Sequence, residues 1–197
     1  MMDDLKRILD SGGAVILPTE TVYGIFAKAL DEEAVNRVYT LKKRPREKAL
    51  NLNVGNFENI LKFSKNQPKY LEKVYNRFMP GPLTIILEAN DNVPYWINSG
   101  LKTVGFRVPN HPVTLELIKQ CGPLIGPSAN ISGQVSGRNY LAILEAFDQK
   151  VTGFSDDVAL TGRDSTILDL TGHKAKILRQ GTITREEISL AVPEIVF

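Results

Sequence analysis

The chain has 197 residues, of which 43% are hydrophobic and 23% charged. This composition fits one globular domain over residues 1–197, large enough to bury roughly 70% of the surface of its unfolded chain. The 24 basic and 22 acidic residues give a net charge of +2, which excludes a bulk polycation. The single cysteine, Cys121, excludes an internal disulfide and a cysteine-rich metal site. With no apolar run of about 18 residues and no signal-like start, we expect a soluble, cytoplasmic protein.

Apolar runs and turn residues alternate through the first half of the chain. Short β-prone runs predict strands, and apolar residues at helical spacing predict helices. Prolines and capping residues set the bounds. The elements predicted in order are a strand over 14–17, a helix that Asp31 caps and that ends before Pro45, a strand over 49–54, and helices over 57–64 and 68–78.

The second half is richer in predicted strands. Their spacing predicts a mixed α/β or α+β domain, in which some neighbouring strands pair as hairpins and others need helical crossovers. The elements predicted in order are strands over 83–87 and 103–108 with a short irregular or helical piece over 94–97 between them, a helix over 112–120, a short strand over 123–125, a polar loop over 126–138, a helix over 139–147, paired strands over 165–170 and 174–178, and a last helix capped by Thr184 and Glu187.

The densest charge feature is the segment 42–48, which has five basic side chains in seven residues. Pro45 prevents a regular helix there, so we expect the side chains to fan out from a helix end and the loop after it. Arginine and lysine donate charge-assisted hydrogen bonds to phosphate oxygens. The segment is therefore a candidate phosphate-binding site, and a solvated surface loop is the alternative.

Two polar loops follow predicted strands. In the first, over 18–24, the hydroxyls of Thr19, Thr21 and Tyr23 and the carboxylate of Glu20 are expected to converge on one strand end. The alternative is a turn whose threonines bond the backbone. The second, over 126–138, combines small residues and hydroxyls, which let backbone amides cradle anionic oxygens. Its alternative is a flexible loop.

Arg107 stands in an otherwise apolar strand, so it must face an acidic partner or an anionic ligand. Arg179 and Ser165 are polar residues at strand ends, where structural pairing is the simpler interpretation. There is no phosphate-binding P-loop and no dinucleotide fingerprint. His111 and His173 lie far apart in predicted turns, which argues against a zinc site or a serine–histidine–aspartate triad. Positioned hydroxyls and arginines must therefore carry any reaction, and Cys121 is interpreted as a packing residue.

Six motifs together resemble the YrdC family, in the same order and over nearly the whole chain. They are Pro18-Thr19-Glu20-Thr21-Val22-Tyr23-Gly24, Lys42-Lys43-Arg44-Pro45 with Lys48 and Leu50, Arg107-Val108-Pro109, Pro127-Ser128-Ala129-Asn130-Ile131-Ser132-Gly133, Ser165-Thr166-Ile167 and Leu178-Arg179-Gln180-Gly181. The resemblance implies a three-layer domain around a twisted mixed sheet with a deep, positively charged cavity. Longer relatives carry an additional C-terminal domain, for which 197 residues leave no room.

The resemblance also implies an activity. Members of this family are threonylcarbamoyl-AMP synthases, nucleotidyltransferases that convert L-threonine, bicarbonate or carbon dioxide, and ATP into threonylcarbamoyl-adenylate and pyrophosphate. The product feeds threonylcarbamoyladenosine formation in tRNA, so a downstream tRNA-modifying complex is an expected partner. Mg²⁺ is expected to enter with ATP, and no protein metal site is predicted.

The site residues follow from the motif matches. Arg44 and Lys48 are expected to stabilise the negative charge that develops on the phosphates. Where this chain has Asn53, longer relatives often have histidine, so an acid–base role at this position is doubtful. The residues expected to contact threonine are Thr19, Asn53, Arg107, Gly126 and Thr166, and those expected to contact ATP are Lys42, Arg44, Lys48, Thr103, Ser128, Ser136 and Arg179.

Two other functions are compatible with the sequence. A basic concave surface would bind double-stranded RNA or a ribosome-assembly intermediate through phosphates, although the chain lacks an RNA-binding motif. A carbamoyl-transferring domain similar to those of hydrogenase-maturation proteins would share the fold, but the zinc-finger and acylphosphatase parts of those proteins are absent.

Overall fold

The computed structural model describes residues 1–197 and has a mixed ten-stranded sheet at its centre. The strand order is β10-β9-β5-β6-β3-β7-β2-β1-β8, and β4 pairs with β5 beside this path. The strands are β1 (Val15–Leu17), β2 (Gly24–Lys28), β3 (Leu52–Asn53), β4 (Ser64–Lys65), β5 (Leu83–Ala89), β6 (Thr103–Arg107), β7 (Leu124–Ile125), β8 (Thr152–Gly153), β9 (Thr166–Asp169) and β10 (Lys176–Arg179).

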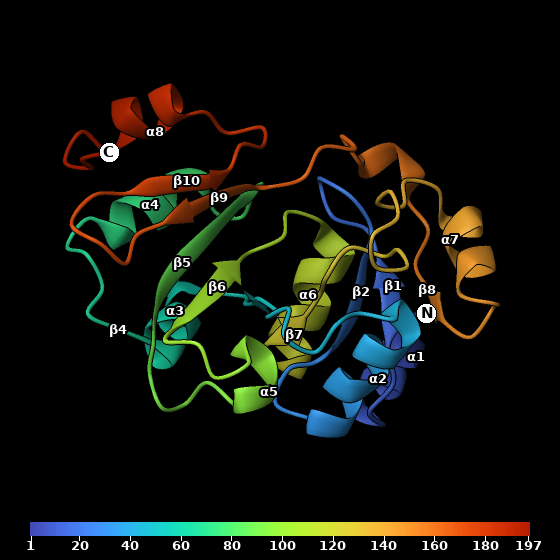
Figure 1. Ribbon diagram of the computed structural model, residues 1–197. Helices are drawn as coiled ribbons and strands as arrows, with labels where there is room; N and C mark the ends of the chain where they lie inside the picture. Colours follow the sequence, from blue (N-terminus) through green and yellow to red (C-terminus); the bar gives the residue numbers. More distant parts are fainter.

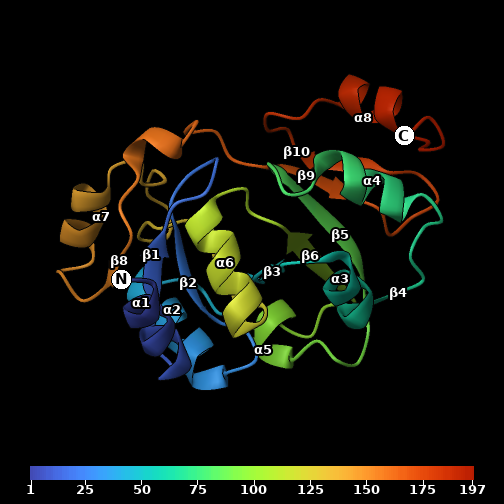
Figure 2. The ribbon, with the colours of Figure 1, turned by 180° about the vertical axis from the view of Figure 1, so that it is seen from behind.

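Helices cover both faces of the sheet (Figures 1 and 2). They are α1 (Met2–Asp10), α2 (Glu32–Lys42), α3 (Phe57–Phe63), α4 (Leu71–Phe78), α5 (Tyr95–Asn98), α6 (Pro112–Cys121), α7 (Tyr140–Ala146) and α8 (Arg185–Ala191), with a 3-10 turn η1 at Asp157–Ala159. This layered arrangement confirms the predicted mixed α/β class.

Alternation along β1 and β2 divides the core into two clusters, because successive strand residues point to opposite faces. Val15 and Leu17 pack with Phe26 under α1 and α6. Ile16 and Ile25 belong to the larger cluster on the other face, which includes the buried apolar residues of α2. The sheet is therefore covered on both faces in this half of the molecule, as a three-layer fold requires.

The other half of the sheet is built around β5. This strand runs antiparallel to β6 on one side and parallel to β9 on the other. Residues of α3, α4 and α8 pack in the same core cluster as Leu83 and Ile85. Antiparallel pairing of β9 with β10 confirms the hairpin predicted from the sequence.

Most predicted elements are present, with shifted bounds. The Asp31 side chain accepts from the Ala34 amide at the start of α2, and Thr184 with Glu187 forms the predicted capping box of α8. The helix predicted from residue 68 begins at Leu71, because residues 68–70 form a turn before it. The strand β2 was not predicted, because it begins at Gly24, a residue typical of the end of a polar loop.

Candidate functional site

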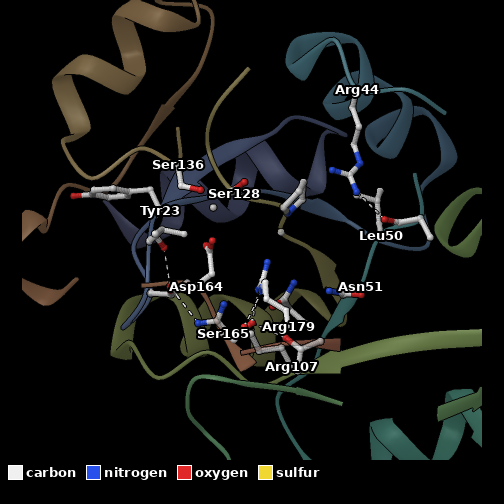
Figure 3. Close-up of a pocket in the computed structure, with 18 residues that line it drawn as sticks. Tyr23, Arg44, Leu50, Asn51, Arg107, Ser128, Ser136, Asp164, Ser165 and Arg179 are labelled. Carbon is white, nitrogen blue, oxygen red and sulfur yellow. Dashed lines mark hydrogen bonds between the residues drawn. The ribbon is translucent and has the colours of Figure 1, made fainter. Parts of the chain in front are cut away.

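A cavity of about 200 Å³ opens where several strand ends and loops meet. Figure 3 shows Ser128 and Ser136 on one side, Ser165, Arg107 and Arg179 on the opposite side, and Arg44 at one end. The lining residues are Thr19, Val22, Tyr23, Gly24, Arg44, Ala49, Leu50, Asn51, Asn53, Thr84, Arg107, Gly126, Pro127, Ser128, Ser136, Asp164, Ser165 and Arg179.

Arg107 is held by the loop between β1 and β2. Its Nη2 donates to Glu20 Oε1 at 2.6 Å and to Thr21 Oγ1 at 2.8 Å, with Thr19 Oγ1 at 3.4 Å. The other oxygen of Glu20 accepts from the Asn110 amide at 2.7 Å. Arg107 therefore has the acidic partner that its place in an apolar strand requires. Its Nε is buried and has no hydrogen-bond partner within the protein.

The hydroxyls of this loop also bond each other. Thr19 and Thr21 are buried, and their Oγ1 atoms lie 2.9 Å apart. Thr19 Oγ1 donates to the Val22 carbonyl at 2.7 Å. The expected convergence of Thr19, Thr21 and Glu20 on one strand end is confirmed. Tyr23 differs, because its hydroxyl donates to Asp157 at 2.6 Å, away from these residues. Burial, together with that bond, raises the pKa of Tyr23 to about 12.

Arg179 reaches the cavity from the end of β10. Its Nε donates to the Ser165 carbonyl at 2.9 Å and its Nη2 to Ser165 Oγ at 3.0 Å. Ser165 Oγ lies 2.9 Å from Thr84 Oγ1, and both of these side chains are buried. The start of β9 and the start of β5 thus fix the orientation of this guanidinium.

Arg44 follows the C-terminus of α2, where Lys43 adopts a left-handed conformation with φ of 50°. This conformation ends the helix and directs the chain into the loop before β3. Arg44 Nη2 donates to the Ala49 carbonyl at 2.8 Å, and its Nε to the Lys48 carbonyl at 3.3 Å. The loop therefore folds around the guanidinium that it carries.

Lys42 is buried, with only 1% of its surface exposed. It therefore does not fan out into solvent with the rest of the basic segment. Its Nζ donates to the carbonyls of Ser128 at 2.5 Å and Asn130 at 2.7 Å. No carboxylate pairs with it, and burial, with a smaller contribution from Arg44, lowers its pKa to about 8. The ammonium group thus ties the C-terminus of α2 to the loop that carries Ser128.

Two glycines allow a close approach beneath this loop. A Cβ on Gly24 or Gly126 would lie 2.6 or 2.4 Å from the ring of Phe26, which is fully buried. Any side chain there would displace core atoms, so glycine is required at both positions. The loop is held further by Ala129, whose amide donates to the Tyr23 carbonyl at 2.8 Å.

Eight of the twelve predicted site residues line this one cavity, although they come from segments far apart in the sequence. Asn53, from β3, is buried, and its Nδ2 donates to the Leu124 carbonyl at 3.3 Å. The ligand contacts assigned to these residues stay predictions. The eight are Thr19, Arg44, Asn53, Arg107, Gly126, Ser128, Ser136 and Arg179.

Four predicted residues do not line the cavity. Lys42 lies behind the loop, and Thr166 is fully buried, where its hydroxyl donates to the Ile183 carbonyl at 2.7 Å. Lys48 has an exposed side chain. Thr103 begins β6, four residues before Arg107, which separates the two by about 13 Å, and its contact with ATP stays a prediction. It borders a different surface groove, with Lys65 and Glu88.

Asn51, Thr84 and Asp164 also line the cavity, although they were not predicted as site residues. Thr84 carried a signal, because it is the one hydroxyl in the apolar run 83–87. Asp164 directly precedes Ser165, but an acidic residue after Arg163 and Gly162 is also typical of an exposed turn. His111 was expected in a turn and instead lies buried before α6, with Nε2 3.1 Å from Asp156 Oδ2.

The lining carries three arginines and one aspartate, together with the hydroxyls of Thr19, Ser128, Ser136 and Ser165. Such a donor set suits small ligands with several anionic oxygens.

No group of three or more histidine, cysteine, aspartate or glutamate side chains could hold a metal ion. None of the helices has the length and apolar character needed to cross a membrane. Fold and site together define an α/β protein with an arginine-lined cavity at its strand ends.

Comparison with known proteins identifies the family to which this chain belongs. The model of the Sua5/YciO/YrdC family, described as "Telomere recombination", matches residues 7–181. The chain therefore belongs to this family, which confirms the resemblance inferred from the six motifs.

Two curated relatives are named threonylcarbamoyl-AMP synthase. The one from Pyrococcus abyssi is 40% identical over 186 residues, and the one from Bacillus subtilis is 33% identical over 191 residues. These alignments cover 93% and 95% of this chain, but the chain spans only 55% of the length of each relative.

A solved structure shows the same fold. The crystal structure of P. abyssi Sua5 complexed with L-threonine superposes with a TM-score of 0.93 at 37% identity, covering 99% of this chain and 58% of that one.

Proposed function

We propose that this chain is an L-threonylcarbamoyladenylate synthase, which converts L-threonine, bicarbonate or carbon dioxide, and ATP into threonylcarbamoyl-AMP and pyrophosphate. The observation that carries the proposal is the gathering of Arg44, Arg107 and Arg179 around one cavity. The printed names of the two relatives and the threonine complex of P. abyssi Sua5 support the choice of substrates.

In this proposal the end of the cavity beside β1 and β6 binds threonine. Arg107 offers the substrate carboxylate its guanidinium group, whose protein bonds are all made by Nη2. Asn53 and the hydroxyl of Thr19 line the same cavity and supply neutral polar contacts. The backbone of Gly126 contributes without a side chain.

ATP would bind at the side formed by Arg44, Ser128 and Ser136, with Arg179 opposite. Arg44 stabilises the negative charge of the phosphates, and preorganised donors of this kind supply much of the rate acceleration in such reactions. Lys48 is carried on the same loop as Arg44. Lys42 acts indirectly, because its ammonium group binds the loop backbone.

The reaction needs no covalent enzyme intermediate. The amine of threonine adds to carbon dioxide and loses a proton, which gives a carbamate. A carbamate oxygen then attacks the α-phosphorus of ATP, and the bond to the leaving pyrophosphate breaks. Holding the labile carbamate in line with the phosphate is the main task of the protein, and positioning of this kind contributes several kcal/mol.

Mg²⁺ is proposed to enter with ATP. In enzymes this ion usually binds substrate phosphates and one or two carboxylates, and the cavity lining has a single carboxylate, Asp164. When bound, the ion would neutralise charge on the phosphates.

We also propose that the product passes to a tRNA-modifying partner. No observation on this structure favours the RNA-binding alternative.

Replacement of Arg44 tests the proposal. Arg44→Ala should lower pyrophosphate release in the presence of threonine, bicarbonate and ATP by about 100-fold or more, because a guanidinium facing the phosphates is lost. Circular dichroism and the unfolding temperature should stay near those of the wild type, since Arg44 lies on a surface loop. A near-wild-type rate would remove Arg44 from its proposed role.

A further inference from the structure

The positive groups of the cavity are anchored, but its one negative group is not. Arg44 donates to the carbonyls of Lys48 and Ala49, Arg179 to Ser165, and Arg107 to Glu20. Asp164 lines the same cavity, and its carboxylate accepts no hydrogen bond and forms no ion pair within the protein. Asp164 is exposed and forms no ion pair with the three arginines of the lining, so its carboxylate is available to a ligand.

The backbone that carries Asp164 is held on both sides. The Thr166 amide donates to the Pro82 carbonyl at 3.0 Å, which pins the start of β9 to the start of β5. On the other side, a Cβ on Gly181 would lie only 2.4 Å from the Asp164 carbonyl oxygen, so these two backbone segments are in close contact. Asp164 is therefore presented from a fixed position.

Asp164 lies at the threonine end of the proposed site. It directly precedes Ser165, and Figure 3 shows it on the side of Ser165 and Arg107, well apart from Arg44. Arg44 is the group expected to bind phosphate. In the proposed site, a carboxylate at this end lies away from the phosphates of ATP and is not repelled by them. It lies in the same small cavity as Arg107, the guanidinium expected to bind the carboxylate of threonine.

An α-amino acid carries one charge of each sign. Arg107 meets the negative end, and no group other than Asp164 in the lining can offer a full negative charge to the positive end. We propose that Asp164 is a specificity-determining residue, whose carboxylate accepts a hydrogen bond from the α-amino group of the substrate. This rests on the proposed function. The contact survives the first chemical step, since the carbamate nitrogen keeps one N–H.

Paired ligands test this assignment. L-Threonine and 3-hydroxybutanoate share the carboxylate and the hydroxyl, but the second lacks the amino group. Calorimetric titration of the full chain with each, in the presence of a non-hydrolysable ATP analogue and Mg²⁺, measures what the amino group contributes. Asp164→Asn should weaken threonine binding by about 10-fold to 100-fold, the value of a charged hydrogen bond, and should leave 3-hydroxybutanoate binding nearly unchanged.

Asp148→Asn is the matched control. Asp148 is exposed, and its only ion pair is with Lys150 at 3.2 Å. Its φ of 53° is one that asparagine adopts readily, so the variant makes the same change of charge away from the cavity. Threonine affinity of this variant should equal that of the wild type.

Three results would overturn the assignment. Unchanged threonine affinity in Asp164→Asn would remove the contact. An equal loss for threonine and 3-hydroxybutanoate would mean that Asp164 only supports the shape of the cavity. A higher Mg²⁺ requirement with unchanged threonine affinity would make it a metal ligand. If the wild type binds the ATP analogue but not threonine, the proposed function itself fails, and the role of Asp164 fails with it.

Discussion

The two sides of the cavity are held in different ways. On the side of Arg107, the side chains belong to strand ends or to the short β1–β2 loop, and many bonds join them, from Thr19, Thr21 and Glu20 to the guanidinium. On the side of Ser128 and Ser136, the residues lie on a long loop, and the buried ammonium of Lys42 holds two of its carbonyls. The first side is held mainly by side chains at strand ends, and the second by the backbone of a loop, through Lys42 and through amides such as that of Ala129.

This difference suits the two proposed substrates. Threonine is small and must be distinguished from other amino acids, so a wall preorganised by the sheet favours selectivity. ATP is larger than the cavity of about 200 Å³, so in this proposal part of it extends beyond the lining residues on the side of the loop. The three predictions below test this contrast, beginning with the largest expected effect.

The first prediction concerns Lys42, whose pKa falls from an ordinary 10.5 to about 8 in the folded protein. Between these values the unfolded chain binds more protons, so the contribution of Lys42 to the free energy of unfolding increases as the pH rises from 8 to 10. The full shift corresponds to about 3 kcal/mol. In denaturant titrations, the free energy of unfolding of the wild type should therefore rise relative to that of Lys42→Met as the pH increases from 8 to 10.

The control for this experiment is the adjacent residue. Lys43 is exposed, and Lys43→Met removes the same charge from the same segment. A change with pH that both variants share would report the loss of a positive charge from this segment and not the burial of Lys42. If Lys42→Met behaves in the same way, the ammonium of Lys42 is not buried as described here.

The second prediction concerns the side fixed by strands. Arg107→Lys keeps the charge but loses the planar fork of donors, so kcat/KM for threonine should fall by about 10-fold to 100-fold. The KM for ATP should change little, because Arg107 lies at the other end of the cavity from Arg44 (Figure 3). Steady-state pyrophosphate release gives both constants. Arg37→Lys, on the exposed surface of α2, serves as the control, and an equal rise in both KM values would contradict the separation of the two sides.

The third prediction concerns α8, which lies outside the 7–181 match and away from both sides of the cavity. Thr184→Ala removes the cap of this helix and should lower the free energy of unfolding by about 1 kcal/mol. The rate of pyrophosphate release at 25 °C should be unchanged. A slower rate in a fully folded variant would show that α8 influences the site.

Much of the fold could be predicted from local signals. Asp31 and Thr184 cap helices as their sequences indicate, because capping depends on residues three positions away. The strand β2 was missed, since the run Ile25-Phe26-Ala27 follows Gly24, which is typical of a turn. Its pairing partners, Val15 to Leu17 and the residues of β7, are set by the tertiary structure.

Most site residues were predicted from the family resemblance, and Arg107 was also predicted from its conflict with an apolar strand. Arg107 in an apolar strand required a partner, and the structure provides Glu20. Lys42 in a basic run gave no sign of burial, because its partners lie 86 and 88 residues further along the chain. Thr103 was placed in the site through the resemblance, and only the direction of β6 shows that it lies at the other end of the strand from Arg107.

The most direct test of the account is the identity of the product. Incubation of the chain with ATP, Mg²⁺, L-threonine and ¹³C-labelled bicarbonate, followed by mass spectrometry, should detect an adenylate that contains threonine and the labelled carbon, and its formation should require all three substrates. If pyrophosphate is released without this adenylate, or if the adenylate carries no label, the proposed reaction is contradicted.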